Sequence, residues 1–151
     1  LCFMPGVTPD QKIAAERMII QRLPDVELGS KMTLSRRATA DVVGAILREG
    51  DSRLTPACLD NPRLKEVAIL QFLNSSRARA ATISIIARHE KWKNRPNLRM
   101  AILKNRNTPD IWYTLFLPKL KTADMNNLLM SRRLKPQQKK LVQQELKKRC
   151  L

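Results

Sequence analysis

The decapeptide LKNRNTPDIW, residues 103–112, decides the fold, because four other stretches superpose on it without gaps. Each begins with an apolar residue that can end one helix, continues through Asn, Ser or Arg, and predicts a new helix from its seventh position. A turn that recurs between short helices predicts stacked helix pairs. The other four stretches are LSRRATADVV (34–43), LDNPRLKEVA (59–68), LNSSRARAAT (73–82) and MSRRLKPQQK (130–139), so the seventh positions are Ala40, Lys65, Arg79, Pro109 and Pro136.

Start and stop signals around these segments predict about ten short helices. Thr8-Pro9-Asp10 opens the first, Asp25 is expected to cap the second, and Gly50 is expected to stop the third. Helices this short are marginal alone, so they are expected to stack on their neighbours. The predicted helices are 8–23, 26–34, 39–49, 52–59, 65–73, 79–88, 98–103 with Pro96 at its first position, 108–117, one opening at 122–124, and one from Pro136 to the end.

The segments resemble the bacterial α-helical repeat proteins of the HEAT-like and leucine-rich-repeat-variant kind. The stretch from LDNPRLKEV through ARHEKW to LKNRNTPDIW carries the resemblance, which covers about residues 30–150. It implies an all-α protein with the architecture of an α-solenoid, a HEAT-like superhelix of helix–turn–helix pairs. Function is not implied, because such families serve many roles.

The organisation expected from this pattern is one helical-repeat domain over residues 1–151. Residues 1–29 fit the repeat poorly and are expected to form an N-terminal cap. Residues 30–135 hold the repeats, and residues 136–151 form a basic C-terminal helix.

Charge points to an anionic partner. The chain has 29 Lys and Arg against 13 Asp and Glu, a formal net charge of +16. The imbalance lies in the C-terminal half, since residues 1–30 have a net charge of −1 and residues 121–151 a net charge of +7. A chain of this kind is expected to meet nucleic acid or another anionic surface.

The five segments concentrate cations just before helix N-termini, where free backbone N–H groups favour anions. If stacking lines the segments along one edge, their side chains form a row of phosphate-binding sites. The alternative is ordinary turn chemistry, because polar turns are exposed in any helical protein. The eleven cations are Arg36, Arg37, Arg63, Lys65, Arg77, Arg79, Lys104, Arg106, Arg132, Arg133 and Lys135.

The loop ARHEKWKNRPNLR places Trp92 among Lys91, Lys93 and Arg95, which suits stacking on a base with phosphate contacts around it. The alternative is that the Trp92 ring is buried under an adjacent helix. Trp112 lies on an apolar face and is most simply a core residue.

The last helix, KPQQKKLVQQELKKRC, has two readings. It can lie along a phosphate backbone, or it can be a solvated helix that caps the repeats.

Catalysis is not expected. His89 is the single histidine, the cysteines Cys2, Cys58 and Cys150 lie far apart, and no Gly-rich phosphate loop is present. No metal site or cofactor is expected. One remote enzymatic reading is kept: alkylpurine DNA glycosylases of the HEAT-like kind are similar in pairing an Asp with aromatic residues, which Asp110 or Asp124 with Trp92 or Trp112 could mimic.

The sequence predicts a cytoplasmic protein with no membrane association. No apolar run approaches the ~18 to 20 residues of a membrane span, and the opening LCFMPGV lacks the basic start of a secretory signal. The first residue is Leu, which is typical of a fragment of a longer chain.

Together these features predict a non-enzymatic binding module that contacts DNA or RNA phosphates independently of sequence. The alternative is a scaffold that recognises an acidic protein on its concave face, with charge steering the encounter.

Overall fold

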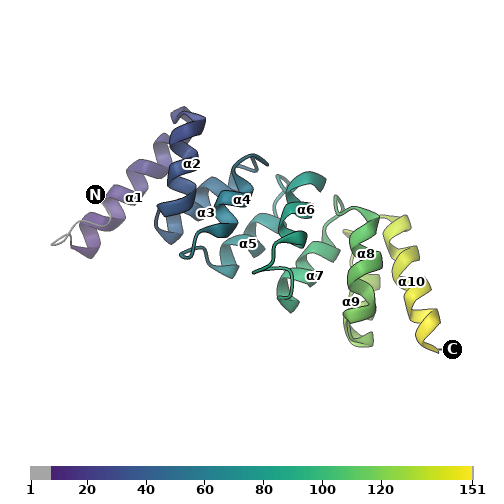
Figure 1. Cartoon of the computed structure of the whole chain (residues 1–151). Helices are drawn as coiled ribbons and strands as arrows, with labels where there is room; N and C mark the ends of the chain where they lie inside the picture. Colours follow the sequence, from purple (N-terminus) through teal and green to yellow (C-terminus); the bar gives the residue numbers. More distant parts are fainter. Residues whose placement is uncertain (1–7, 151) are drawn as a thin grey trace. The chain divides into compact units, whose positions relative to one another are not determined.

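The computed structural model describes residues 8–150, and regular structure in that range is entirely helical. It contains ten α-helices, α1 to α10, and two short 3-10 helices, η1 and η2 (Figure 1). The all-α prediction is therefore confirmed. The chain divides into two compact units, Leu1–Phe72 and Leu73–Leu151, and each is described by itself.

The first unit is built around α3. Helix α1 packs on α3, and α2 packs on both α3 and α4. Its core comes from the apolar face predicted for 39–49, with Val42, Val43, Ile46 and Leu47 at most 1% exposed. The elements are α1 (Pro9–Arg22), η1 (Leu23–Asp25), α2 (Leu28–Arg37), α3 (Ala40–Arg48), α4 (Thr55–Asp60) and most of α5 (Glu66–Leu73).

The second unit is built around α7 and α8. Helix α7 packs on α6, α8 and α9, while α10 packs on α8 and α9. Tyr113 of α8 is fully buried and donates its hydroxyl to the carbonyl of Leu103, which satisfies the phenol inside an apolar core. The elements are α6 (Ala80–Arg88), α7 (Pro96–Lys104), α8 (Asp110–Phe116), η2 (Leu117–Lys119), α9 (Thr122–Met130) and α10 (Pro136–Cys150).

Local signals placed most helix boundaries well. Thr8 caps α1 through a reciprocal pair, in which its Oγ1 accepts from the Gln11 N–H at 3.2 Å and the Gln11 Oε1 accepts from the Thr8 N–H at 3.1 Å. Gly50 follows α3 with φ of 79°, a left-handed conformation that favours glycine.

Helices α2 and α4 begin later than predicted. Helix α2 starts at Leu28 after Glu27, because Asp25 is taken into η1, and it continues to Arg37 instead of ending at Leu34. Helix α4 starts at Thr55 instead of Ser52. The Asp51 carboxylate accepts from the Arg53 N–H at 2.9 Å, and this local turn competes with the helix. The later start leaves Pro56 in the first turn, where it is tolerated.

Candidate nucleic-acid interface

Four helices end in the same kind of turn, here called the capped turn. The first residue donates its N–H to the carbonyl three residues earlier, which ends the helix, and its side chain accepts from the N–H two residues later. The acceptor-to-nitrogen distances are 2.8 Å for Asn61, 3.1 Å for the Nδ1 of His89, 2.8 Å for Asn105 and 3.3 Å for Ser131. Asn and Ser form such turns readily because a short polar side chain reaches its own backbone.

The fourth residue of each capped turn is buried. Leu64, Trp92, Thr108 and Leu134 occupy this position, and none is more than 6% exposed. The loop around Trp92 is therefore a variant of the turn in LKNRNTPDIW, which the sequence analysis treated as a separate motif. Aligning HEKW (89–92) with NRNT (105–108) could have revealed this equivalence from the sequence.

The capped turns also correct two expectations about the segments. Ser131 is equivalent to Asn105, so the last segment starts at Leu129 and not at Met130. The first segment differs more, because α2 runs to Arg37 and places Arg36 and Arg37 in its last helical turn. These two arginines are therefore not in a loop.

Side-chain amides join the segments to one another. In the first unit, Asn61 donates from Nδ2 to the carbonyls of Ser35 and Ala38, at 3.0 and 3.1 Å. The Arg63 guanidinium also donates to the Arg37 carbonyl at 3.2 Å. Segments 34–40 and 59–65 therefore lie side by side.

Three segments are joined in the second unit. Asn105 donates from Nδ2 to the Leu73 carbonyl at 2.8 Å, and Asn107 donates from Nδ2 to the Ala78 carbonyl at 2.9 Å. Gln138 of α10 donates from Nε2 to the carbonyl of Arg106 at 3.1 Å. Segments 73–79, 103–109 and 129–135 therefore follow one another in space.

These bonds group the segments by unit. Segments 34–40 and 59–65 form a pair in the first unit, and the other three segments form a trio in the second.

The trio is hollowed by two adjoining cavities, of about 500 and 490 Å³, that share Asn74, Lys104 and Arg133. Together they are called the cationic groove. Four of the predicted cations line it, and no Asp or Glu is among its lining residues. The full lining is Leu73, Asn74, Ser75, Ser76, Lys104, Asn105, Arg106, Asn107, Asn127, Met130, Ser131, Arg133 and Lys135.

Charge is concentrated in the unit that holds the groove. The sequence of the first unit contains ten Lys and Arg and nine Asp and Glu, a net charge of +1, whereas the second contains 19 and four, a net charge of +15. Two of those four acids are already paired, since Glu90 lies 3.0 Å from the Lys93 ammonium and Glu145 lies 3.8 Å from the Arg149 guanidinium. An anion approaching the second unit therefore meets little local competition.

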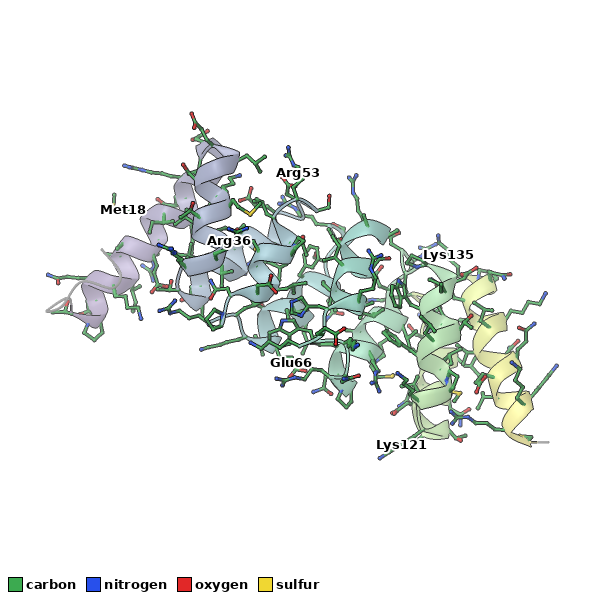
Figure 2. All side chains as sticks on the ribbon, in the orientation of Figure 1. Met18, Arg36, Arg53, Glu66, Lys121 and Lys135 are labelled. Atoms are coloured by element: carbon green, nitrogen blue, oxygen red, sulfur yellow. The ribbon has the colours of Figure 1, made fainter. Side chains whose placement is uncertain are left out.

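All eleven predicted turn cations are exposed. Four of them, Lys104, Arg106, Arg133 and Lys135, line the groove. Figure 2 labels Lys135, which follows α9 in the chain, and Lys121, which precedes α9. Three more, Arg77, Arg79 and Arg132, belong to the same trio but do not line either cavity. Arg36, Arg37, Arg63 and Lys65 lie on the paired segments of the first unit.

The Trp92 cluster has a different arrangement from the one that suits base stacking. The Trp92 side chain is only 3% exposed, with the Lys91 ammonium 4.8 Å and the Arg95 guanidinium 5.2 Å from the ring centroid. Its ring is thus covered, as the alternative reading expected, and cation–π contacts hold the two cations against it. Lys93 is paired with Glu90.

Backbone donors beside two helix starts are already used by the chain. The Arg79 N–H donates to the Thr82 hydroxyl at 3.0 Å, and the Lys135 N–H donates to the side-chain Oε1 of Gln138 at 2.9 Å. These two N–H groups are therefore already hydrogen-bonded within the chain, and the exposed side-chain cations are the charged groups that the groove presents.

The thiol, tryptophan and aspartate side chains considered for catalysis differ in their burial. Burial raises the pKa of the Cys58 thiol to about 11, so it stays protonated and non-nucleophilic at neutral pH. Trp92 and Trp112 are both buried, while Asp110 is exposed and Asp124 half-buried. Within residues 8–150, no three His, Cys, Asp or Glu side chains gather in a group able to hold a metal ion.

Among residues 8–150, no helix combines the length and apolar character needed to cross a bilayer.

Sequence reasoning missed the residues that build the groove. Asn105, Asn107 and Gln138 supply the joining amides, and Asn74, Ser75, Ser76, Asn127 and Met130 complete the lining. The third and fifth positions of LKNRNTPD contained the signal, because an amide repeated beside a helix end can cap its own turn and reach the next one.

Comparison with models of known protein families gives no match, and searches of curated proteins and of solved structures give none either.

Proposed function

We propose that the protein is a non-enzymatic binding module whose cationic groove contacts nucleic-acid phosphates without reading sequence. The observation that supports the proposal most directly is the set of four exposed cations, Lys104, Arg106, Arg133 and Lys135, around one concave surface with no acidic residue in its lining. Phosphate contacts of this kind provide most of the affinity in sequence-independent binding.

The neutral side chains of the groove support the same ligand. Asn74, Ser75, Ser76 and Asn127 bring amide and hydroxyl donors between the cations. Such groups commonly donate to phosphate and sugar oxygens beside Lys and Arg. The joining amides of Asn105 and Asn107 hold the backbone under the cations in a defined place.

We further propose that the helices form an α-solenoid of helix–turn–helix pairs. The support is that side-chain amides join equivalent turns within each unit, in the pair 34–40 and 59–65 and in the trio 73–79, 103–109 and 129–135. Helix α10 fits the end of such an array, because Val142 is buried while Lys140, Lys147 and Lys148 are exposed.

The test is a titration of labelled DNA and RNA with wild-type protein and with the double variant Lys104→Gln/Arg133→Gln. Wild type is expected to bind at low salt, with an affinity that falls steeply as salt rises. Each lost phosphate contact lowers the slope of log affinity against log salt by about 1, so the double variant is expected to lose about 2. The matched control is Lys12→Gln/Arg17→Gln, which removes the same charge from exposed positions of α1.

Absence of binding by the wild type at low salt would overturn the proposal. Equal losses in the two double variants would also count against it, because net charge alone would then explain the binding and the groove would have no special part.

A second candidate is binding of an acidic protein, and one observation favours it. A cavity of about 550 Å³ between α6 and α8 combines apolar side chains with Arg88 and Lys119. Leu115, at its lining, is 49% exposed. A partner with acidic residues beside an apolar side chain would suit this cavity. Retention of partners after nuclease treatment, and their loss in Leu115→Ser, is the outcome expected for this function.

A further inference from the structure

The Phe, Trp and Tyr side chains of residues 8–150 are all buried. Phe72, Trp92, Trp112, Tyr113 and Phe116 are each at most 8% exposed. Proteins that bind single strands gain much of their affinity by stacking unpaired bases on exposed aromatic rings. Residues 8–150 offer no exposed Phe, Tyr or Trp ring to a ligand.

The groove itself has no aromatic face. Its lining consists of cations, amides, hydroxyls, Leu73 and Met130. Met130 is 82% exposed and is the large apolar side chain most open to a ligand there, but a thioether cannot replace a stacking platform. A bound strand is therefore expected to place its phosphates in the groove and to gain little from its bases.

Charge density then decides which form of nucleic acid binds better. A duplex carries one phosphate charge per ~1.7 Å of its axis, which is twice the linear charge density of one of its strands. It also releases more counterions per neutralised phosphate than a single strand does. The cations of the groove stand on turns that Asn105, Asn107 and Gln138 join to their neighbours. Cations spaced by a fixed backbone suit the regular phosphates of a double helix better than those of a flexible strand.

We infer that the cationic groove selects double-stranded over single-stranded nucleic acid, by holding one sugar–phosphate strand of a duplex with the bases turned away. This inference rests on the proposed function and names the form of the ligand. Because the bases are not contacted, two duplexes of unrelated sequence are expected to bind alike.

The experiment measures the affinity of the full chain for one labelled duplex, for each of its separated strands, and for a duplex of scrambled sequence, at one salt concentration. The strands are chosen without self-complementarity. The duplexes are expected to bind equally, and at least about tenfold more tightly than either strand, because the strands lack both the charge density and the stacking contribution. Strands that bind as tightly as the duplex, or a large difference between the duplexes, would overturn the inference while leaving phosphate binding intact. Loss of all binding would instead remove the proposed function.

A gain-of-stacking variant tests the physical reason. Asn74 is exposed and lines both cavities, so Asn74→Tyr places one ring in the groove and Asn74→Leu places an apolar side chain without a π-face. Asn74→Tyr is expected to raise single-strand affinity about tenfold over Asn74→Leu, and to narrow the preference for duplex. Equal single-strand affinities in the two variants would show that the lack of a stacking ring is not what weakens strand binding, which contradicts the physical reason given for the inference.

Discussion

At the scale of single residues, the buried carboxyl group of Glu16 shows how burial changes the pKa of a side chain. Glu16, on α1, is only 6% exposed and lies near Asp41 of α3. Burial raises the pKa of the Glu16 carboxyl above its ordinary value of 4.5, and a hydrogen bond and like charge from Asp41 raise it further, while Lys12 and Thr39 act in the opposite direction. Two carboxyl groups thus meet in the unit with the lower net charge.

This arrangement predicts a pH-dependent effect of Glu16→Gln. Because the folded-state pKa is raised, the stability contributed by the Glu16 carboxyl is present below its ordinary pKa and is lost as pH rises through the folded value. Glutamine has no charge to lose, so the variant is expected to unfold about 2 to 5 °C above wild type at neutral pH. The difference is expected to vanish below pH 4.5. Thermal unfolding followed by circular dichroism over this pH range measures it, and a constant difference at all pH values would contradict the assignment.

At the scale of elements, the joining amides connect turns that lie far apart in the chain. Asn61 is fully buried, accepts from the Arg63 N–H, and donates to two carbonyls of the preceding segment. A buried carbonyl that loses its donor retains the cost of its desolvation. The short helices are thus held together by side-chain hydrogen bonds at their ends as well as by apolar packing.

Asn61→Ala is expected to lower the free energy of unfolding by about 2 kcal/mol, because it removes the cap and both joining bonds. Asn61→Asp retains the cap acceptor but places a carboxylate against the Ser35 and Ala38 carbonyls, so it is expected to be at least as destabilising at neutral pH. A protonated carboxyl can donate, so the Asp variant is expected to recover towards wild type in acid. Chemical denaturation measures all three, with Asn126→Ala at an exposed position of α9 as the neutral control.

On the scale of the whole molecule, the dominant feature is the unequal charge of the two units, +1 and +15. A compact body with many like charges is destabilised by their repulsion. Salt screens exposed charges at distances beyond the Debye length, about 10 Å at ~0.1 M.

Raising the salt concentration from about 0.02 to 0.3 M is therefore expected to increase the unfolding temperature of the wild-type protein. The increase is expected to be smaller in Lys104→Gln/Arg133→Gln than in Lys12→Gln/Arg17→Gln, because only the first pair comes from the highly charged unit. Scanning calorimetry measures the shifts. Unchanged or lower unfolding temperatures at high salt would show that charge repulsion does not lower the stability of the folded protein significantly.

The sequence by itself determined the helical class, most helix boundaries and the net charge, because caps, prolines and apolar spacing act within one or two turns of chain. It also identified the five segments and their cations, although the last segment begins at Leu129 and the arginines of the first lie in α2. Tertiary structure alone decided which segments meet, since the joining amides link residues 23 to 33 positions apart. It likewise buried Trp92, whose place as the fourth residue of a capped turn depends on the core beneath it. Local signals cannot tell which turns will meet, because that depends on how the helices between them pack.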